Sequence, residues 1–188
     1  PRFLSTLDRP HCVLIAGAAG MHVRTAGHLL GTAATLSGLW STQRDDYPVT
    51  VRSGHSLSTL ILSPEPVHYT GATAPDLLLV LAAEGWDKIA PIARAMAPNA
   101  TLVTISDLAT VVETPARRLI LQPEALAGVP KASRALAITA ASAAHLDLLS
   151  DQALLNAAAD LNPAYARANQ SAVQAALTHS ATLFLSSS

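Results

Sequence analysis

The chain has 188 residues, of which 50% are hydrophobic and 13% charged, and its formal net charge at pH 7 is −1. This length suits one domain with a sizeable core. The balanced charge, with no basic cluster larger than Arg117–Arg118, argues against a nucleic-acid-binding surface. No apolar run approaches the roughly 18 residues of a membrane span. Residues 1–10 lack the apolar core of a signal peptide, so we expect a cytoplasmic protein.

The cysteine and histidine content narrows the chemistry. Cys12 is the only cysteine, so this chain alone cannot hold an iron–sulfur cluster, which needs several thiolates. The histidines are scattered, without metal-ligand spacing, and no Gly-x-Ser-x-Gly elbow is present. We therefore predict no metal site and no catalytic residue. The hydrophobic excess favours contacts with partner chains, although an alanine-rich composition would give the same count.

The segment from His11 to Gly38 predicts the opening of an α/β domain. Cys12–Ala16 is a continuous apolar run, typical of a strand buried on both faces. Gly17–Gly20 follows as a turn of small residues. Apolar residues then recur at helical spacing from Val23 onward, and the final glycine is placed to end the helix. We expect the turn to direct free backbone N–H groups toward whatever docks there.

Strands and helices alternate along the next part of the chain, and the last part is helical. Strands are predicted over 39–43, 57–63, 77–81, 101–105 and 118–121, and helices over 86–96, over 132–149, from 150, and from Asn162–Pro163 to 177. This order predicts an α/β fold: a Rossmann-like open, mainly parallel sheet flanked by helices, with a helical C-terminal segment. We expect a single domain over 1–188, with residues 1–10 as an N-terminal extension and 186–188 frayed.

Two loops carry the candidate binding residues. The turn at Gly17 lacks two of the three glycines of a dinucleotide fingerprint, because Ala19 and His22 occupy their positions, so an NAD site is not expected. The second loop, Arg52–Ser56, places a cation and small residues before an apolar strand. That arrangement suits a phosphate, a carboxylate or an acidic residue of a partner. A hairpin loop with a solvated arginine fits the same residues equally well.

Together these segments resemble the gamma subunit, or gamma domain, of 2-oxoacid:acceptor oxidoreductases of the pyruvate:ferredoxin type. The family's opening Gly-x-Gly-Gly-Gln-Gly turn corresponds to Gly17–His22. Its Tyr-Gly-Pro-Glu-x-Arg-Gly-Gly-x-Ser segment corresponds to Tyr47–Ser56, and its Ser-Pro-Glu-Pro-Val to Ser63–Val67. Pro75–Asp76, before an apolar strand, also matches. The chain departs from the family at the turn, where Ala19, Met21 and His22 replace two glycines and the glutamine.

The resemblance implies a multisubunit enzyme that oxidises a 2-oxoacid with coenzyme A to an acyl-CoA, carbon dioxide and a reduced acceptor. Thiamine diphosphate, Mg²⁺ and [4Fe-4S] clusters would lie on alpha, beta and ferredoxin-like partners. This chain would serve assembly and coenzyme A access as a non-catalytic gamma subunit. Its candidate cofactor-binding residues are Gly17, Gly20, Arg52, Gly54, His55 and Ser56.

Two alternatives stay open at this point. One is a free-standing Rossmann-like nucleotide-binding enzyme that uses the Gly17 turn. The other is a gamma-like chain recruited into an assembly of different chemistry. The sequence names neither the 2-oxoacid nor the acceptor, which could be ferredoxin or NAD.

Overall fold

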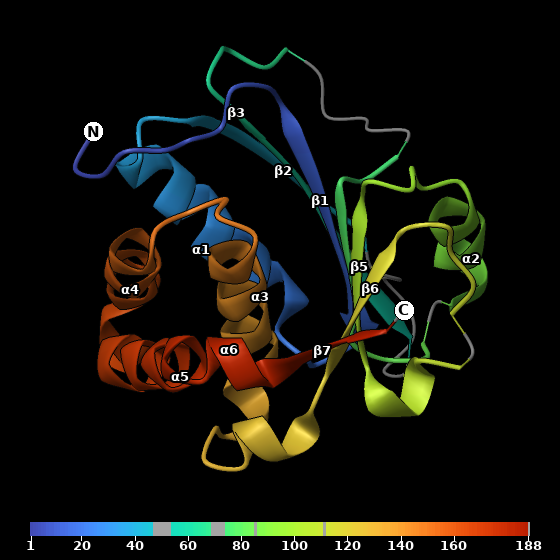
Figure 1. The fold of residues 1–188 in the computed structure, drawn as a ribbon. Coiled ribbons are helices and arrows are strands. Elements are labelled where there is room, and N and C mark those ends of the chain that lie inside the picture. The colour runs from blue at the N-terminus through green and yellow to red at the C-terminus, as the bar shows by residue number, and fades with distance from the viewer. Residues whose placement is uncertain (47–53, 69–73, 85, 111, 188) are drawn as a thin grey trace.

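The computed structural model describes residues 1–46, 54–68, 74–84, 86–110 and 112–187. Its centre is a seven-stranded sheet of order β2-β3-β1-β4-β5-β6-β7 (Figure 1). The strands are β1 (His11–Ala18), β2 (Trp40–Asp46), β3 (His55–Ser63), β4 (Leu77–Val80), β5 (Thr101–Ile105), β6 (Arg117–Leu121) and β7 (Phe184–Ser187).

The directions of these strands confirm a mainly parallel sheet. β1, β4, β5 and β6 are parallel neighbours. β3 is antiparallel to both β1 and β2, so β2 runs in the same direction as β1. β7 is antiparallel to β6. Among the described strands, β3 and β7 are therefore the two that run against the rest.

Helices cover both faces of the sheet (Figure 1). α1 (Val23–Leu36), α3 (Arg134–His145), α4 (Asp151–Asp160) and α5 (Ala166–Thr178) lie on one face, and α2 (Trp86–Arg94) lies on the other. A short helix, α6 (Ser180–Leu183), leads into β7. The predicted helix starts are confirmed by their caps. Ser150 Oγ accepts a hydrogen bond from Ala153 N at 3.3 Å, and Asn162 Oδ1 accepts one from Ala164 N at 3.0 Å.

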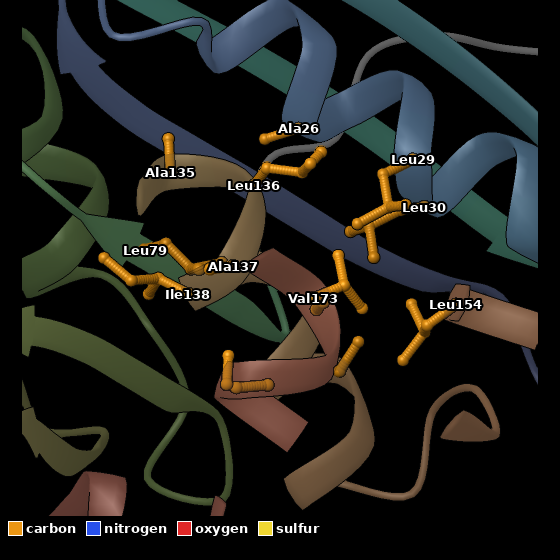
Figure 2. Packing of buried hydrophobic residues seen from close by; sticks show 14 of the residues in the cluster. Ala26, Leu29, Leu30, Leu79, Ala135, Leu136, Ala137, Ile138, Leu154 and Val173 are labelled. Atoms are coloured by element: carbon orange, nitrogen blue, oxygen red, sulfur yellow. The ribbon is translucent and has the colours of Figure 1, made fainter. Parts of the chain in front are cut away.

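The larger core cluster lies between the sheet and the four helices on its first face (Figure 2). Leu30 of α1, Leu79 of β4 and Val173 of α5 are completely buried there. Every residue of α3 from Ala135 to Ala143 is buried, which makes α3 the central helix of this layer. Because most of these side chains are methyl groups, neighbouring helices can approach closely. The alanine content thus serves close helix packing.

The C-terminal end differs from the frayed tail that the sequence predicts. Phe184–Ser187 forms β7, and its last residues, Ser186 and Ser187, lie opposite Leu119 and Arg118 of β6. The strand forms because β6 offers an unpaired edge and the side chain of Phe184 is buried in the core. Sequence reasoning had no partner strand to consider for so short a segment.

Asp76, directly before β4, binds both to the N-terminal extension and to the start of β1. Its Oδ1 accepts a hydrogen bond from Arg9 Nη2 at 2.9 Å, and its Oδ2 accepts one from Cys12 N at 2.8 Å. Burial acts to raise the pKa of Asp76, but these bonds outweigh it and the pKa lies below its ordinary value. Burial also raises the pKa of Cys12 to about 12, so this thiol stays protonated and unreactive.

We expect Asp76→Ala to lower the free energy of unfolding by about 2 kcal/mol, because hydrogen bonds to a charged group contribute about 1.5–3 kcal/mol. Urea denaturation would measure the change. Glu113→Ala is the control, since it removes only an exposed ion pair with Arg94 (3.2 Å) and should cost less than about 1 kcal/mol. Equal losses in the two variants would contradict the role given to Asp76.

The burial of His11 predicts that the stability of the chain depends on pH. Burial lowers its pKa, and its Nε2 is buried without a hydrogen-bond partner in the described residues. On acidification the unfolded chain takes up this proton near its ordinary pKa of about 6.5 while the folded chain resists it. Stability should therefore fall as the pH drops through that value. The contribution of Asp76 to stability is lost only at lower pH, below the ordinary pKa of an aspartate.

We expect the urea midpoint of the wild type to fall between about pH 7.5 and 5.5, and to fall less steeply in His11→Phe, which cannot titrate. The slope difference cannot exceed about 1.4 kcal/mol per pH unit for a single group. Parallel profiles for the two proteins would show that His11 protonates freely in the folded state.

Candidate functional site

The antiparallel pairing of β1 with β3 brings the two predicted loops together. Gly17 lies opposite Ser56, and Ala18 lies opposite His55. Just beyond the strands, Ala19 N donates to Gly54 O at 2.8 Å. The structure therefore places Gly54, His55 and Ser56 of the second segment at the carboxyl end of β1, with Gly20 in the turn that follows. Arg52 lies outside the described residues.

The turn itself keeps most of its backbone donors occupied. Ala18 N donates to Met21 Sδ at 3.2 Å, and Met21 N donates to Ala18 O at 3.1 Å. Ala19 N is taken by Gly54, as described above. The expectation that the turn offers free N–H groups is therefore wrong for these three residues. Met21, which stands where the family has glutamine, fills the turn with its own side chain.

Each glycine of the turn has a structural reason of its own. A Cβ atom on Gly17 would lie 2.7 Å from Val23 Cγ2, so glycine lets α1 start close against the strand end. Gly20 has φ +85°, where other residues are strained, and a Cβ there would meet nothing within 4 Å. The first glycine thus serves packing, and the second serves the path of the backbone.

The free backbone donors lie one step further along, at the start of α1. His22 precedes the helix with φ 60° and provides no side-chain cap, and the first turn carries no acidic residue. In the described part of the chain, the N–H groups of Val23, Arg24 and Thr25 have no hydrogen-bond partner. They carry the positive end of the helix dipole, which favours an anion.

We expect His22→Gly to stabilise the chain. A left-handed conformation costs a non-glycine residue about 1–2 kcal/mol, and glycine gives back roughly half of that in unfolded-state entropy, so the net gain should be about 0.5 kcal/mol. Chemical denaturation measures it. His28→Gly in the middle of α1 is the matched control and should destabilise, because glycine is a poor helix former. A loss of stability in both variants would argue against strain at His22.

A charged cluster holds the ring of His55. Lys88 Nζ of α2 lies 3.0 Å from His55 Nε2 and 3.2 Å from Asp46 Oδ2. A lysine ammonium only donates, so this contact is a hydrogen bond in the tautomer of His55 whose Nε2 accepts. The His55 side chain is only 15% exposed, whereas Lys88 and Asp46 are about half exposed. Sequence reasoning missed both partners: Asp46 lies on the neighbouring strand β2, and Lys88 comes from α2, 33 residues further along the chain.

A cavity of about 640 Å³ opens where the N-terminal parts of α1, α3 and α5 approach one another. It is lined by His22, Arg24, Thr25, His28, Ala132, Ser133, Leu136, Leu161, Asn162, Tyr165, Ala168 and Asn169. None of these lining residues is acidic. No sequence pattern indicates this cavity, because its walls come from three helices that meet only in the fold.

Two further observations concern metal ions and membranes. The described residues contain no group of three or more His, Cys, Asp or Glu side chains placed to hold a metal ion. Within the same ranges, no helix combines the length and the apolar character needed to cross a bilayer.

Comparison with solved structures defines the class of this fold. The gamma subunit of a keto/oxoacid ferredoxin oxidoreductase from Geobacter sulfurreducens superposes with a TM-score of 0.74 at 23% identity, covering 94% of this chain and 99% of that one. The pyruvate oxidoreductase subunit PORC from Thermotoga maritima gives a TM-score of 0.72 at 11% identity, covering 96% and 100%. These likenesses establish the gamma-subunit fold.

The sequence establishes the family. The chain belongs to the pyruvate ferredoxin/flavodoxin oxidoreductase family, whose model matches residues 12–178. Two curated relatives are 2-oxoglutarate synthase subunits KorC, from Methanothermobacter marburgensis (36% identical over 70 residues) and Methanocaldococcus jannaschii (31% over 77 residues). These alignments cover 37% and 40% of this chain and 38% and 41% of the relatives, so they span about two fifths of each protein.

Proposed function

We propose that this chain is the non-catalytic gamma subunit of a cytoplasmic, multisubunit 2-oxoacid:acceptor oxidoreductase. Sister alpha and beta subunits would hold thiamine diphosphate and Mg²⁺, and a ferredoxin-like subunit or domain would hold the [4Fe-4S] clusters. Bound thiamine diphosphate supplies the electron sink for oxidising the 2-oxoacid, and the protein contributes orientation and exclusion of water. This chain would form one wall of that assembly.

The observation that carries the proposal is the way this fold recurs in solved structures. It makes up 99% of the separate Geobacter gamma subunit. In the 2-oxoglutarate:ferredoxin oxidoreductase from Magnetococcus marinus, it matches 31% of a longer chain with a TM-score of 0.77 at 13% identity, covering 94% of this chain. A module found both as a separate subunit and as part of a larger chain is suited to work beside the remaining parts.

Features of the described surface support contact with sister subunits. Trp40 on edge strand β2 is 56% exposed, and Leu185 on edge strand β7 is 55% exposed. Large apolar side chains beside unpaired strand edges are typical of docking surfaces. We further propose that the loop pair, Gly17–Gly20 with Arg52–Ser56, faces a sister subunit or the coenzyme A region. The glycine turn has little to offer a phosphate directly, because most of its donors are already used.

The test is purification of the tagged chain from its native source, followed by mass spectrometry of the co-purifying chains. We expect sister subunits that contain thiamine diphosphate, and 2-oxoacid-dependent reduction of an acceptor in the presence of coenzyme A. The names of the two KorC relatives make 2-oxoglutarate the first 2-oxoacid to assay. A stable single-chain protein without such partners, and with micromolar affinity for NAD, would instead support the free-standing nucleotide-binding enzyme.

We expect Lys88→Met to lower turnover of the assembled complex several-fold, because His55 at the loop pair loses the donor that fixes its ring. The melting temperature of the isolated chain should stay within about 2 °C, since exposed ion pairs contribute about 0–1 kcal/mol. Lys88→Arg should restore most of the turnover because it can donate to the same ring nitrogen. If turnover falls only as much as stability falls, Lys88 has a structural role and does not act through His55.

A further inference from the structure

We propose that Lys88 is a modification site, where a small acyl thioester transfers its acyl group to the side-chain nitrogen and His55 acts as the base. The choice of a thioester rests on the proposed function, because oxidation of a 2-oxoacid with coenzyme A forms an acyl thioester. The reaction itself needs only this chain, and the cluster of Lys88, His55 and Asp46 supplies the groups for it.

His55 lies where a base for Lys88 is needed. Its Nε2 is 3.0 Å from Lys88 Nζ, within the roughly 2.6–3.2 Å over which a positioned base takes up a proton. In the tautomer whose Nε2 accepts, the lysine nitrogen donates one N–H to the ring, and the lone pair of the neutral amine stays free to attack. The His55 side chain is only 15% exposed, so the surrounding residues hold the ring in place.

Asp46 stabilises the positive charge before and after the proton moves. Its Oδ2 lies 3.2 Å from Lys88 Nζ and 3.8 Å from His55 Nε2. A proton that passes from the lysine nitrogen to the ring therefore stays beside the same carboxylate. The carboxylate alone would slow acylation, because it favours the ammonium form of lysine, which cannot attack. Fast acylation of Lys88 thus requires the histidine.

The nitrogen of Lys88 is accessible from solvent. The side chain is 53% exposed, and it belongs to the first turn of α2, on the face of the sheet opposite the large helical layer (Figure 1). A small thioester can approach Nζ there without a preformed pocket. The largely buried ring of His55 is shielded from the same reagent, so the stable product forms on the lysine.

The transfer involves no oxidation or reduction. The lysine ammonium first releases one proton to water. The amine nitrogen then attacks the thioester carbonyl carbon, a C–N bond forms, and the nitrogen gives a second proton to His55 Nε2. The C–S bond breaks, and the leaving thiolate takes that proton from the ring. The products are an amide on Lys88, a free thiol and the proton released at the start, and His55 is regenerated.

The sequence contains an internal standard for this reaction. Lys88 and Lys131 are the two lysines of the chain. Lys131 is exposed in a short 3₁₀ turn, Lys131–Ser133, and within the described ranges it forms no ion pair. It reports how fast an unassisted lysine reacts. Because the ion pair with Asp46 alone would make Lys88 the slower of the two, the ratio of the two rates tests for the base.

The experiment incubates the full chain with S-acetyl-N-acetylcysteamine at about pH 8. Peptide mass spectrometry, after digestion with a protease that does not cleave at lysine, follows acetylation of both lysines in the same sample. General-base assistance contributes about 10²–10⁴-fold in enzyme sites. At this half-exposed site we expect Lys88 to react at least fivefold faster than Lys131. Equal rates, or slower acetylation of Lys88, would overturn the proposal.

Variants separate the base from a simple hydrogen-bond partner. His55→Gln keeps an acceptor for Lys88 but cannot take up the proton, so the ratio of the two rates should fall to one or below, with the melting temperature confirming the fold. His28→Gln, at an exposed position of α1, is the matched control and should leave the ratio unchanged. An unchanged ratio in His55→Gln would overturn the role of His55.

Unfolding provides a control that needs no variant. In guanidinium chloride the wild-type ratio should fall to about one, because Asp46, His55 and Lys88 come from three separate elements that meet only in the fold. A ratio that survives unfolding would arise from the residues next to Lys88 in sequence, and the proposal would be wrong.

The assembled complex provides the second arm, which depends on the proposed function. During turnover with a 2-oxoacid and coenzyme A, we expect the acyl group formed from that 2-oxoacid to appear on Lys88 ahead of Lys131. Protection of Lys88 in the complex would show that a sister subunit covers it, and would overturn the proposal for the assembled enzyme. Failure to purify any complex would contradict the proposed function and leave the result on the isolated chain standing.

Discussion

The antiparallel pairing of β1 with β3 is the constraint on which the rest of this structure depends. It runs from His11 opposite Leu62 to Ala18 opposite His55, and it places a strand of opposite direction between β1 and β2. Because of this insertion, the chain returns to the carboxyl end of β1 after β2. Gly54 and the start of β3 therefore lie beside the glycine turn, and without this pairing the described candidate residues would share no surface.

Much of the fold could be predicted from local signals. The apolar run at Cys12–Ala16, the period change at Val23 and the caps at Ser150 and Asn162 each depend on residues close together in sequence, and each agrees with the structure. What escaped prediction depends on distant partners. β7 forms because β6 leaves an edge open, and a segment that short carries no periodicity of its own.

The candidate site shows the same difference between local features, which can be predicted from sequence, and contacts between distant residues, which cannot. Sequence reasoning selected the two loops as candidate binding residues without predicting that they meet, and the structure places Gly17 opposite Ser56. It could not foresee that Met21 would occupy a donor of the turn, nor that Lys88 would reach His55 from α2. Side-chain contacts between separate elements leave no mark on spacing or composition. For the same reason the cavity at the start of α1 became visible only in three dimensions.

The buried alanines of α3 have a consequence for the whole helical layer. Since most side chains from Ala135 to Ala143 are buried methyl groups, little space is left between α3 and the elements that pack against it. A bulkier residue at Ala140, which is completely buried, could be accommodated only if the surrounding elements moved. The width of the cavity between α1, α3 and α5 therefore depends on buried alanines of α3 that do not line it. Substitutions of these alanines would change the width of the cavity without altering any residue of its walls.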